Sequence, residues 1–369
     1  MRRVLLAGLM ILYCVGIFVA LDLAYSNLLH DRLFPRQTAR VENAWFHHGL
    51  AANFDGSELW GSVRYRLVTN SLGFKDGAVR DVPLTPATRR VLLIGDSFTE
   101  AIGMNFENSF VGLLYQAGQE RPEKIEFLNA AAVSYSPTVY YRKTKYLLEQ
   151  GLRFDEMVVF VDISDVYDEA TAYFCFDDDP RYRAYCPQAE GAPAPRAASV
   201  LTRAFRQVLK TNFRITDVVQ SKFKDKLDQL RGKDLAYWIP RRSASGWTIL
   251  RYDLRDLFYP LDLDTAIARS VQNMQALADL LAARRIPLTI VVYPWPTQLM
   301  NDDRDSRQVS IWREFCVKNC KAFIDLFPVF FAEKDADKEW YARLFLSGDV
   351  HLSGEGNRLV FRELKKRLL

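Results

Sequence analysis

The sequence lacks the features by which several classes of protein are recognised. No block of lysine and arginine resembles a nucleic-acid-binding arm, and a formal net charge of +4 over 369 residues gives no reason to invoke DNA or RNA. Neither Gly-x-Gly-x-x-Gly nor Gly-x-x-x-x-Gly-Lys occurs, so nothing points to a nucleotide. We therefore expect neither a nucleic-acid partner nor a cofactor.

Cysteine is scarce as well. Of five cysteines, Cys14 lies in an apolar run, and the others form two sequence-local pairs, Cys175 with Cys186 and Cys316 with Cys320. No second cluster of Cys or His lies near the last pair, which argues against zinc. Four cysteines allow three pairings in an oxidising compartment, and free thiols packed as small hydrophobes are an equal alternative.

The sequence has one long apolar run, at its start. Arg2 and Arg3 precede an apolar stretch from Val4 to about Leu21, and about eighteen residues are just enough to cross a bilayer core of about 30 Å. The arginines favour a cytoplasmic N-terminus, which predicts a single-pass inner-membrane protein whose later residues lie in the periplasm. A cleaved signal peptide is less favoured, because the run is long for one and no small-x-small site follows.

Short apolar runs alternate with helical patterns along most of the remaining chain. We expect buried strands at residues 91–94, 125–128, 157–161, 288–293 and 322–325. We expect helices at about 104–119, from 137, and at about 264–285, 307–320 and 354–369. This alternation predicts an α/β fold, a three-layer α/β/α sandwich around a parallel sheet, with the active site at the carboxyl ends of the strands.

The chain divides into three predicted parts. Residues 1–25 form the membrane anchor, residues 26–88 a stalk and irregular N-terminal extension, and residues 89–369 the α/β domain. That domain carries an insertion at about 168–250, which is longer than an ordinary connection and typical of a lid or binding element.

The insertion changes composition along its length. It has an acidic patch at Asp177–Asp179, a Pro/Ala-rich stretch around 188–198, and a helical segment rich in Lys and Arg through about Gly232. For the basic segment, a solvated helical face is favoured over binding of anionic lipid or polymer.

One apolar run ends in residues suited to nucleophilic catalysis. The string Val91-Leu-Leu-Ile-Gly-Asp-Ser97-Phe-Thr-Glu100 places Ser97 at the carboxyl end of a strand, near the start of a helix. Backbone N–H groups there can bind an oxyanion. The same residue types also form ordinary turns and caps, so this string alone is weak evidence.

Only one of the four histidines lies in the α/β region. His351 lies two residues after Asp349, just ahead of the last predicted helix. An imidazole is needed to take a serine proton, and a carboxylate is needed to hold its tautomer. The sequence therefore predicts a triad of Ser97, His351 and Asp349, with no metal.

These strings resemble the SGNH, or GDSL-type, hydrolases over roughly residues 89–369. Asn70-Ser-Leu-Gly-Phe74 resembles a segment ahead of the catalytic block in membrane-anchored, polysaccharide-modifying members. The spacing of Asp349 and His351 resembles the alginate-acetyltransferase-like branch. The resemblance implies a Ser-His-Asp triad, a flavodoxin-like sheet and ester chemistry.

Two blocks of that family are altered here. Asn129-Ala-Ala-Ala-Val-Ser134 places Ser134 where the family usually has glycine, and Asp162-Ile-Ser164-Asp165 places Ser164 where it has asparagine. The resemblance implies that both positions, with the backbone N–H of Ser97, form the oxyanion hole. Loss of one oxyanion donor costs about a hundredfold to a thousandfold in rate, so we expect a slow enzyme or a rearranged hole.

Aromatic residues are candidates for the substrate cleft. Trp295, at the end of a predicted strand, is placed to stack on a sugar ring, with burial as packing an equal alternative, and Gln298 would add a polar contact. Trp247 and Trp312 are expected in the core.

The leading hypothesis is a serine esterase or O-acyltransferase acting on O-acetyl groups of an extracytoplasmic polysaccharide, with a place in an envelope polysaccharide-modifying complex left open. The triad does not distinguish water from a sugar hydroxyl as acceptor. A non-catalytic glycan-binding scaffold is the alternative, favoured by the altered blocks and opposed by the intact Ser97, Asp349 and His351. A lipase acting on membrane lipid is a third hypothesis.

Overall fold

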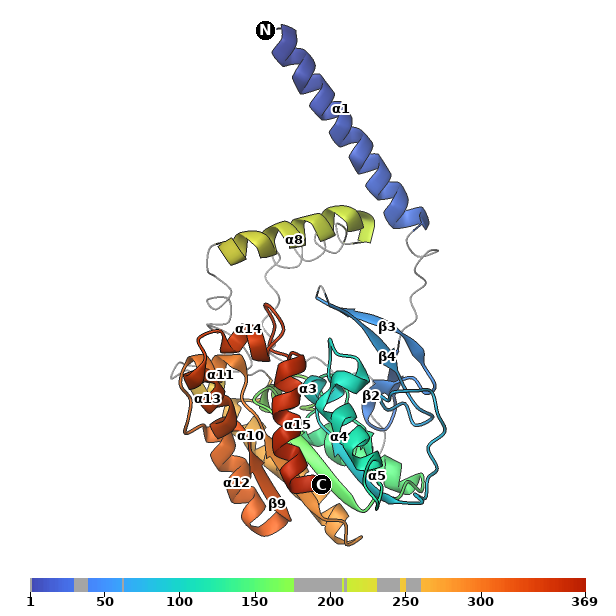
Figure 1. Cartoon of the computed structure of the whole chain (residues 1–369), viewed down its shortest axis with the longest axis vertical. Helices are drawn as coiled ribbons and strands as arrows, with labels where there is room; N and C mark the ends of the chain where they lie inside the picture. The colour runs from blue at the N-terminus through green and yellow to red at the C-terminus, as the bar shows by residue number, and fades with distance from the viewer. Residues whose placement is uncertain are drawn as a thin grey trace. The chain divides into compact units, whose positions relative to one another are not determined.

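The computed structural model describes residues 2–29, 39–61, 63–175, 208, 211–230, 246–249 and 260–369. These residues belong to two compact units. The smaller unit contains the N-terminal helix and helix α8, and the larger unit contains all the described strands and the remaining helices (Figure 1).

The smaller unit is built around the apolar helix that the sequence predicts. Helix α1 spans Arg2–Ala24 and continues as a π-helical turn, η1, at Tyr25–Leu29. The stretch Leu5–Leu29 is long and apolar enough to cross a membrane. The described part of this unit also includes α8, Arg214–Leu230, which lies in the segment predicted to be a basic helix.

The larger unit has a five-stranded parallel sheet at its centre, which confirms the predicted fold class. The strands are β5 (Arg89–Ile94), β6 (Ile125–Asn129), β7 (Glu156–Val161), β8 (Leu288–Val292) and β9 (Ala322–Asp325), and their order in the sheet is β6-β5-β7-β8-β9. All residues of β7 and β8 are buried, as expected of strands covered on both faces.

Helices cover the two faces of the sheet. Helices α4 (Phe110–Gln119) and α15 (Gly354–Leu368) pack together, and α10 (Leu263–Ala282) packs with α5 (Pro137–Glu149) and α12 (Arg307–Asn319). The chain runs one way along the sheet from β5 through α4 to β6, and the other way from β6 to β9 through α5, α10 and α12. Because such crossovers are right-handed, α4 lies on one face and the other three helices lie on the opposite face. Helix α15 lies with α4. The result is the predicted three-layer sandwich.

The shorter helices lie in the connections. They are α3 (Ser97–Glu100), the 3-10 turn η2 (Phe106–Asn108), α6 (Asp165–Thr171), α9 (Gly246–Ile249), α11 (Pro296–Met300), α13 (Phe327–Ala336) and α14 (Trp340–Leu344). The helix predicted from residue 104 begins only at Phe110, because the Ser109 side chain caps it by accepting from the Gly112 N–H.

The N-terminal extension differs from the prediction of irregular structure. Two antiparallel hairpins occur there, one of β1 (Arg40–Asn43) with β2 (His47–Leu50), the other of β3 (Asp55–Trp60) with β4 (Val63–Val68). These strands have four to six residues, and none is a continuous apolar run of the kind that predicts a buried strand. The extension also supplies Phe46, Phe74 and Val82 to the main core, so its residues 39–88 are part of the larger unit.

Several remaining predictions concern single residues. Trp247 and Trp312 are buried, as predicted. Cys316 and Cys320 form a disulfide. Cys186, the acidic patch at 177–179 and the Pro/Ala-rich stretch at 188–198 lie outside the described residues.

Candidate active site

Ser97 follows the central strand β5 through a turn that only glycine fits. A Cβ on Gly95 would lie 2.2 Å from the Thr99 hydroxyl oxygen and 3.0 Å from the Phe160 Cβ. Asp96 caps helix α3, its carboxylate accepting from the Phe98 N–H at 3.0 Å. Local sequence therefore places Ser97 at the first position of α3, at the carboxyl edge of the sheet.

His351 and Asp349 come from the loop between α14 and α15 and reach this edge. His351 Nε2 lies 2.8 Å from Ser97 Oγ, and His351 Nδ1 lies 2.5 Å from Asp349 Oδ1. The same carboxylate oxygen accepts from the backbone N–H of His351 at 3.0 Å. The three residues predicted from sequence thus form one hydrogen-bonded chain across 254 residues of sequence.

Asp349 is held by further partners that the sequence did not reveal. Trp60, at the end of β3, donates its indole N–H to Asp349 Oδ2 at 2.7 Å, and its ring meets the His351 ring edge-on at a centroid distance of 5.1 Å. The Tyr341 hydroxyl bonds both the backbone N–H and the carbonyl of Asp349, each at 3.0 Å. Burial opposes ionisation of Asp349, but the hydrogen bonds from His351 and Trp60 hold its pKa below its ordinary value.

The backbone N–H groups of Ser97 and of Ser134, whose loop is bonded to α3 through Glu100, are candidates for binding an oxyanion. The N–H groups of Ser97 and Ser134 donate to no acceptor within the described part of the chain. Ser134 has φ of 57°, a left-handed conformation that favours glycine, which fits a position that is usually glycine in the resembling family. The Tyr173 hydroxyl fixes this turn by donating to the Ser134 carbonyl at 2.6 Å.

Ser164 is oriented differently. Its backbone N–H and its hydroxyl both donate to Asp162 Oδ1, each at 2.6 Å. Asp162 therefore occupies both donors that Ser164 would offer to an oxyanion. The other Asp162 oxygen accepts the indole N–H of Trp295 at 2.8 Å.

A pair of carboxyl groups lies directly beneath the nucleophile. Asp96 is buried and accepts from the Tyr293 hydroxyl at 3.0 Å; its carboxyl group lies 3.1 Å from Ser97 Oγ and beside the carboxyl group of Asp162. Burial, followed by the neighbouring charge of Asp162, raises the pKa of Asp96 well above its ordinary value. Asp96 therefore gives up its proton less readily than an exposed aspartate does.

Of the two candidate substrate residues, one lies at the site and the other is enclosed. Trp295 is half-buried, with its ring stacked 6.0 Å from the ring of Phe98, the residue after Ser97. Gln298 is fully buried, and its amide bonds the backbone N–H of Trp295 and four side chains. Gln298 thus supports the turn that carries Trp295.

An ion pair fixes helix α3 to the loop that carries Ser134. Arg40 on β1 donates to both oxygens of Glu100, at 2.7 and 2.9 Å, and one of these oxygens also accepts from the Val133 N–H at 2.8 Å. Burial opposes ionisation of Glu100, but its bonds to Arg40 keep its pKa below the ordinary value. The buried Glu100 carboxylate therefore supports both the helix that begins at Ser97 and the loop that carries Ser134.

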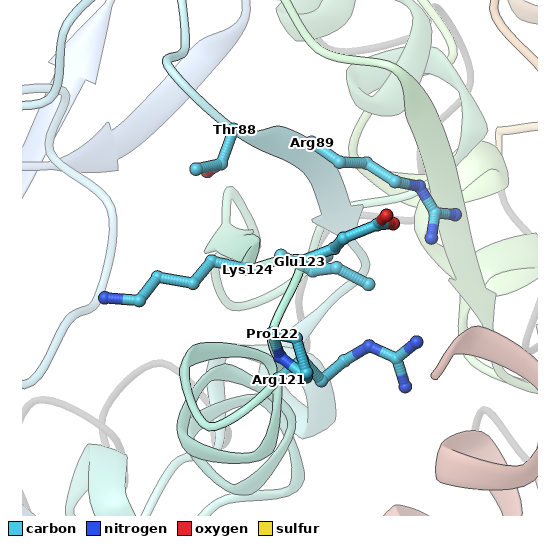
Figure 2. A pocket seen from close by; sticks show the side chains of 7 residues that line it. Thr88, Arg89, Arg121, Pro122, Glu123 and Lys124 are labelled. Carbon is cyan, nitrogen blue, oxygen red and sulfur yellow. The ribbon is translucent and has the colours of Figure 1, made fainter.

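The described residues contain no group of three or more His, Cys, Asp or Glu side chains arranged to hold a metal ion. A pocket of about 490 Å³ lies instead at the opposite edge of the sheet, where β5 and β6 begin. Its lining residues are Thr88, Arg89, Arg121, Pro122, Glu123, Lys124 and Ile125 (Figure 2). Arg89 is already paired with Glu156 at 2.7 Å. Since ligands of such sheets bind at the carboxyl ends of strands, this pocket is not part of the candidate active site.

Comparisons with known proteins give fold likeness alone. No family model matches the chain. No curated protein matches it either. Among solved structures, the acetyl xylan esterase AlAXEase has 15% identity and a TM-score of 0.42, with 76% of this chain and 100% of that chain covered. The psychrotrophic esterase EstA from Pseudoalteromonas sp. has 12% identity and a TM-score of 0.39, with 75% and 95% covered.

A third solved structure is a putative lipolytic protein of the G-D-S-L family from Desulfitobacterium hafniense. It has 15% identity and a TM-score of 0.39, with 76% of this chain and 99% of that chain covered. All three TM-scores lie below 0.5. The function of this chain therefore has to be argued from its own site.

Proposed function

We propose that the chain is a serine esterase of the SGNH type, with Ser97 as nucleophile, His351 as general base and Asp349 as the residue that orients the imidazole. The observation that carries this proposal is the hydrogen-bonded chain from Ser97 Oγ through His351 to Asp349, with links of 2.8 and 2.5 Å. Ester hydrolysis through a serine nucleophile needs this order of groups.

The geometry supports a two-step reaction. His351 Nε2 takes the Ser97 proton as Oγ attacks the ester carbonyl, and the protonated imidazole then gives that proton to the departing alcohol. Water or a sugar hydroxyl, deprotonated by the same imidazole, releases the acyl group and restores Ser97. Asp349 keeps the Nδ1 proton on the side away from the serine and stabilises the imidazolium.

The oxyanion is assigned to the backbone N–H groups of Ser97 and Ser134. Both are without an acceptor in the described residues, whereas the donors of Ser164 are held by Asp162. A hole with two donors in place of three is expected to lower the rate by about a hundredfold to a thousandfold. The proposal is therefore a slow esterase with a rearranged hole.

The proposed substrate is an O-acetyl group of a polysaccharide outside the cytoplasm, with transfer to a second sugar hydroxyl as the companion reaction. Support comes from the resemblance to membrane-anchored, polysaccharide-modifying hydrolases and from the half-buried Trp295 ring beside Phe98. The apolar helix at Leu5–Leu29 supports a single-pass anchor, and the arginines ahead of it favour a periplasmic site.

A second candidate function is a glycan-binding scaffold that retains the fold without turnover. One observation favours it: the backbone N–H and the hydroxyl of Ser164 both donate to Asp162 and are not free for a substrate. The hydrogen-bonded chain at Ser97 opposes it, since binding alone does not require a serine, an imidazole and a carboxylate in that order.

Release of 4-nitrophenol from 4-nitrophenyl acetate by the full chain in detergent tests the two candidates. We expect Ser97→Ala to abolish turnover, because no other group in the site is placed to form the acyl-enzyme. Ser310→Ala, a serine on α12 with no side-chain hydrogen bond among the described residues, should leave turnover unchanged. Equal activity of folded wild type and Ser97→Ala would reject the esterase and favour the scaffold.

A further inference from the structure

An aspartate at the end of the apolar N-terminal helix bonds the first turn of α8. Asp22 is fully buried, and its Oδ2 accepts from the backbone N–H and the hydroxyl of Thr216 at 2.8 and 2.6 Å. Its Oδ1 accepts from the Ile215 N–H and the Ser26 hydroxyl, both at 3.0 Å. Ser26 Oγ in turn accepts from the Arg214 N–H at 2.9 Å.

These bonds have a clear physical reason. The first N–H groups of an α-helix lack partners within the helix and carry its positive dipole end, so a carboxylate there is stabilised. An acidic side chain in an apolar segment is costly unless it is paired in this way. Asp22 and Ser26 therefore fix the start of α8 to the end of the stretch that is long enough to cross a membrane.

Helix α8 presents an apolar stripe. Ile215, Val219, Phe223 and Leu227 recur every four residues, which places them on one face of the helix. Val219 and Phe223 are 57% and 66% exposed, so more than half of each side chain is left uncovered by the described residues. Exposed apolar groups gathered on one helix face mark an interaction surface.

We propose that α8 is an interfacial helix whose apolar stripe lies in the surface of the same bilayer that α1 crosses. The inference rests on the membrane anchor of the proposed function. Asp22 and Ser26 hold the start of α8 at the level where the apolar helix leaves the hydrocarbon, which brings the stripe to the headgroup boundary. The sequence of α8 has four basic and three acidic residues, so burial of the stripe, and not attraction to anionic lipid, supplies the binding.

Nitroxide labels on the full chain in lipid nanodiscs test this location. Cys14 is free and lies within α1, so a label there reports whether α1 is in the bilayer. In a Cys14→Ser background, labels are placed at Val219→Cys and Phe223→Cys on the stripe and at Gln220→Cys as the matched exposed neighbour off the stripe. The Cys14→Ser chain without a new cysteine gives the background labelling.

We expect labels at positions 219 and 223 to be relaxed by oxygen, which concentrates in lipid, and position 220 to be relaxed by a water-soluble nickel chelate. Stripe labels in water with Cys14 in lipid would overturn the inference and leave the anchor intact. Stripe labels shielded from both reagents would mean that α8 packs against protein, which also overturns it. A Cys14 label in water would reject the anchor itself.

A second variant tests the role of Asp22. Asp22→Leu removes every acceptor oxygen that the aspartate offers to α8, and we expect the oxygen accessibility of the 219 label to fall at least twofold while the Cys14 label is unchanged. Replacing the nanodisc lipids with neutral ones should not move the stripe labels. If α8 left the surface of neutral lipid, attraction between charges would be what binds it. If the label at position 219 kept its wild-type depth in the Asp22→Leu chain, Asp22 would have no part in positioning α8.

Discussion

The orientation of the imidazole depends on one tryptophan far away in the chain. Trp60 and Asp349 are separated by 289 residues, yet the indole N–H donates to the carboxylate at 2.7 Å. This bond uses the Asp349 oxygen that His351 does not, so it holds the carboxylate in the plane that the imidazole needs. Trp60 is therefore a positioning residue that acts through Asp349.

Trp60→Phe should lower kcat/KM by about tenfold or more, since a hydrogen bond to a charged group contributes about 1.5 to 3 kcal/mol. Removing this donor lets the pKa of Asp349 rise towards its ordinary value. Asp349 must be ionised to orient His351, so the loss should be constant between pH 5 and pH 8 and should grow only below about pH 4, the ordinary pKa of an aspartate. The measurement is a pH profile of 4-nitrophenyl acetate hydrolysis.

Trp45→Phe is the matched control, because Trp45 lies in the first hairpin turn and stacks on Tyr146 away from the site. It should keep the wild-type profile. A Trp60→Phe protein with an unchanged profile would show that the carboxylate is held without the indole.

At the scale of elements, the nucleophile helix α3 is held from behind by the N-terminal extension. The Lys75 ammonium donates to the carbonyls of Ala101 and Met104 at 2.7 Å each, which closes the end of α3. Burial lowers the pKa of Lys75 to about 8, opposed by the charge of Glu100. The hairpin β1–β2 adds Arg40, the partner of Glu100. The extension thus acts as a support of the site.

Arg40→Leu should destabilise the fold by about 2 to 3 kcal/mol and reduce activity beyond that loss. Removing one partner of a fully buried ion pair costs about 3 to 5 kcal/mol. The expected cost is smaller here because the Arg40 side chain is 31% exposed. Activity should fall further because Glu100 also holds the Val133 N–H beside Ser134. Urea unfolding and esterase assays measure the two effects.

Arg66→Leu offers a control from the neighbouring hairpin. Its pair with Asp55 is more than half exposed on the arginine side and is screened by water, so we expect little change in stability and unaltered activity. Equal effects of the two arginine variants would contradict a special role for the Arg40 pair.

At the scale of the whole molecule, the two units have separate interiors. None of the three hydrophobic core clusters among the described residues contains a residue from 1–37 or 191–237. The core of the larger unit should therefore form without the apolar helix.

A chain that begins at residue 38 should fold without the apolar helix, with a kcat/KM within about twofold of the full chain and a melting temperature within about 3 °C. Size-exclusion chromatography, thermal unfolding and the esterase assay test this. Aggregation or loss of the thermal transition would show that the larger unit needs the N-terminal segment to fold.

The strands and the reacting groups were predictable because they depend on local chemistry. Continuous apolar runs such as Met157–Val161 report burial on both faces, and the Gly-Asp-Ser turn at Ser97 follows the end of such a run. Only one histidine lies in the α/β region, so His351 was the natural partner. By itself, the sequence determined the parallel sheet and predicted which residue types meet at its carboxyl edge.

Tertiary structure alone decided how those groups are supported. Trp60 reaches Asp349 from a hairpin that sequence patterning took as irregular, and Gln298 is enclosed although it follows a site residue. Asp162 accepts from both donors of Ser164, whereas the backbone N–H of Ser134 has no acceptor among the described residues. Sequence periodicity reports which faces are buried but not which distant side chains meet. Those contacts depend on how the packed helices and strands bring loops together at one edge of the sheet.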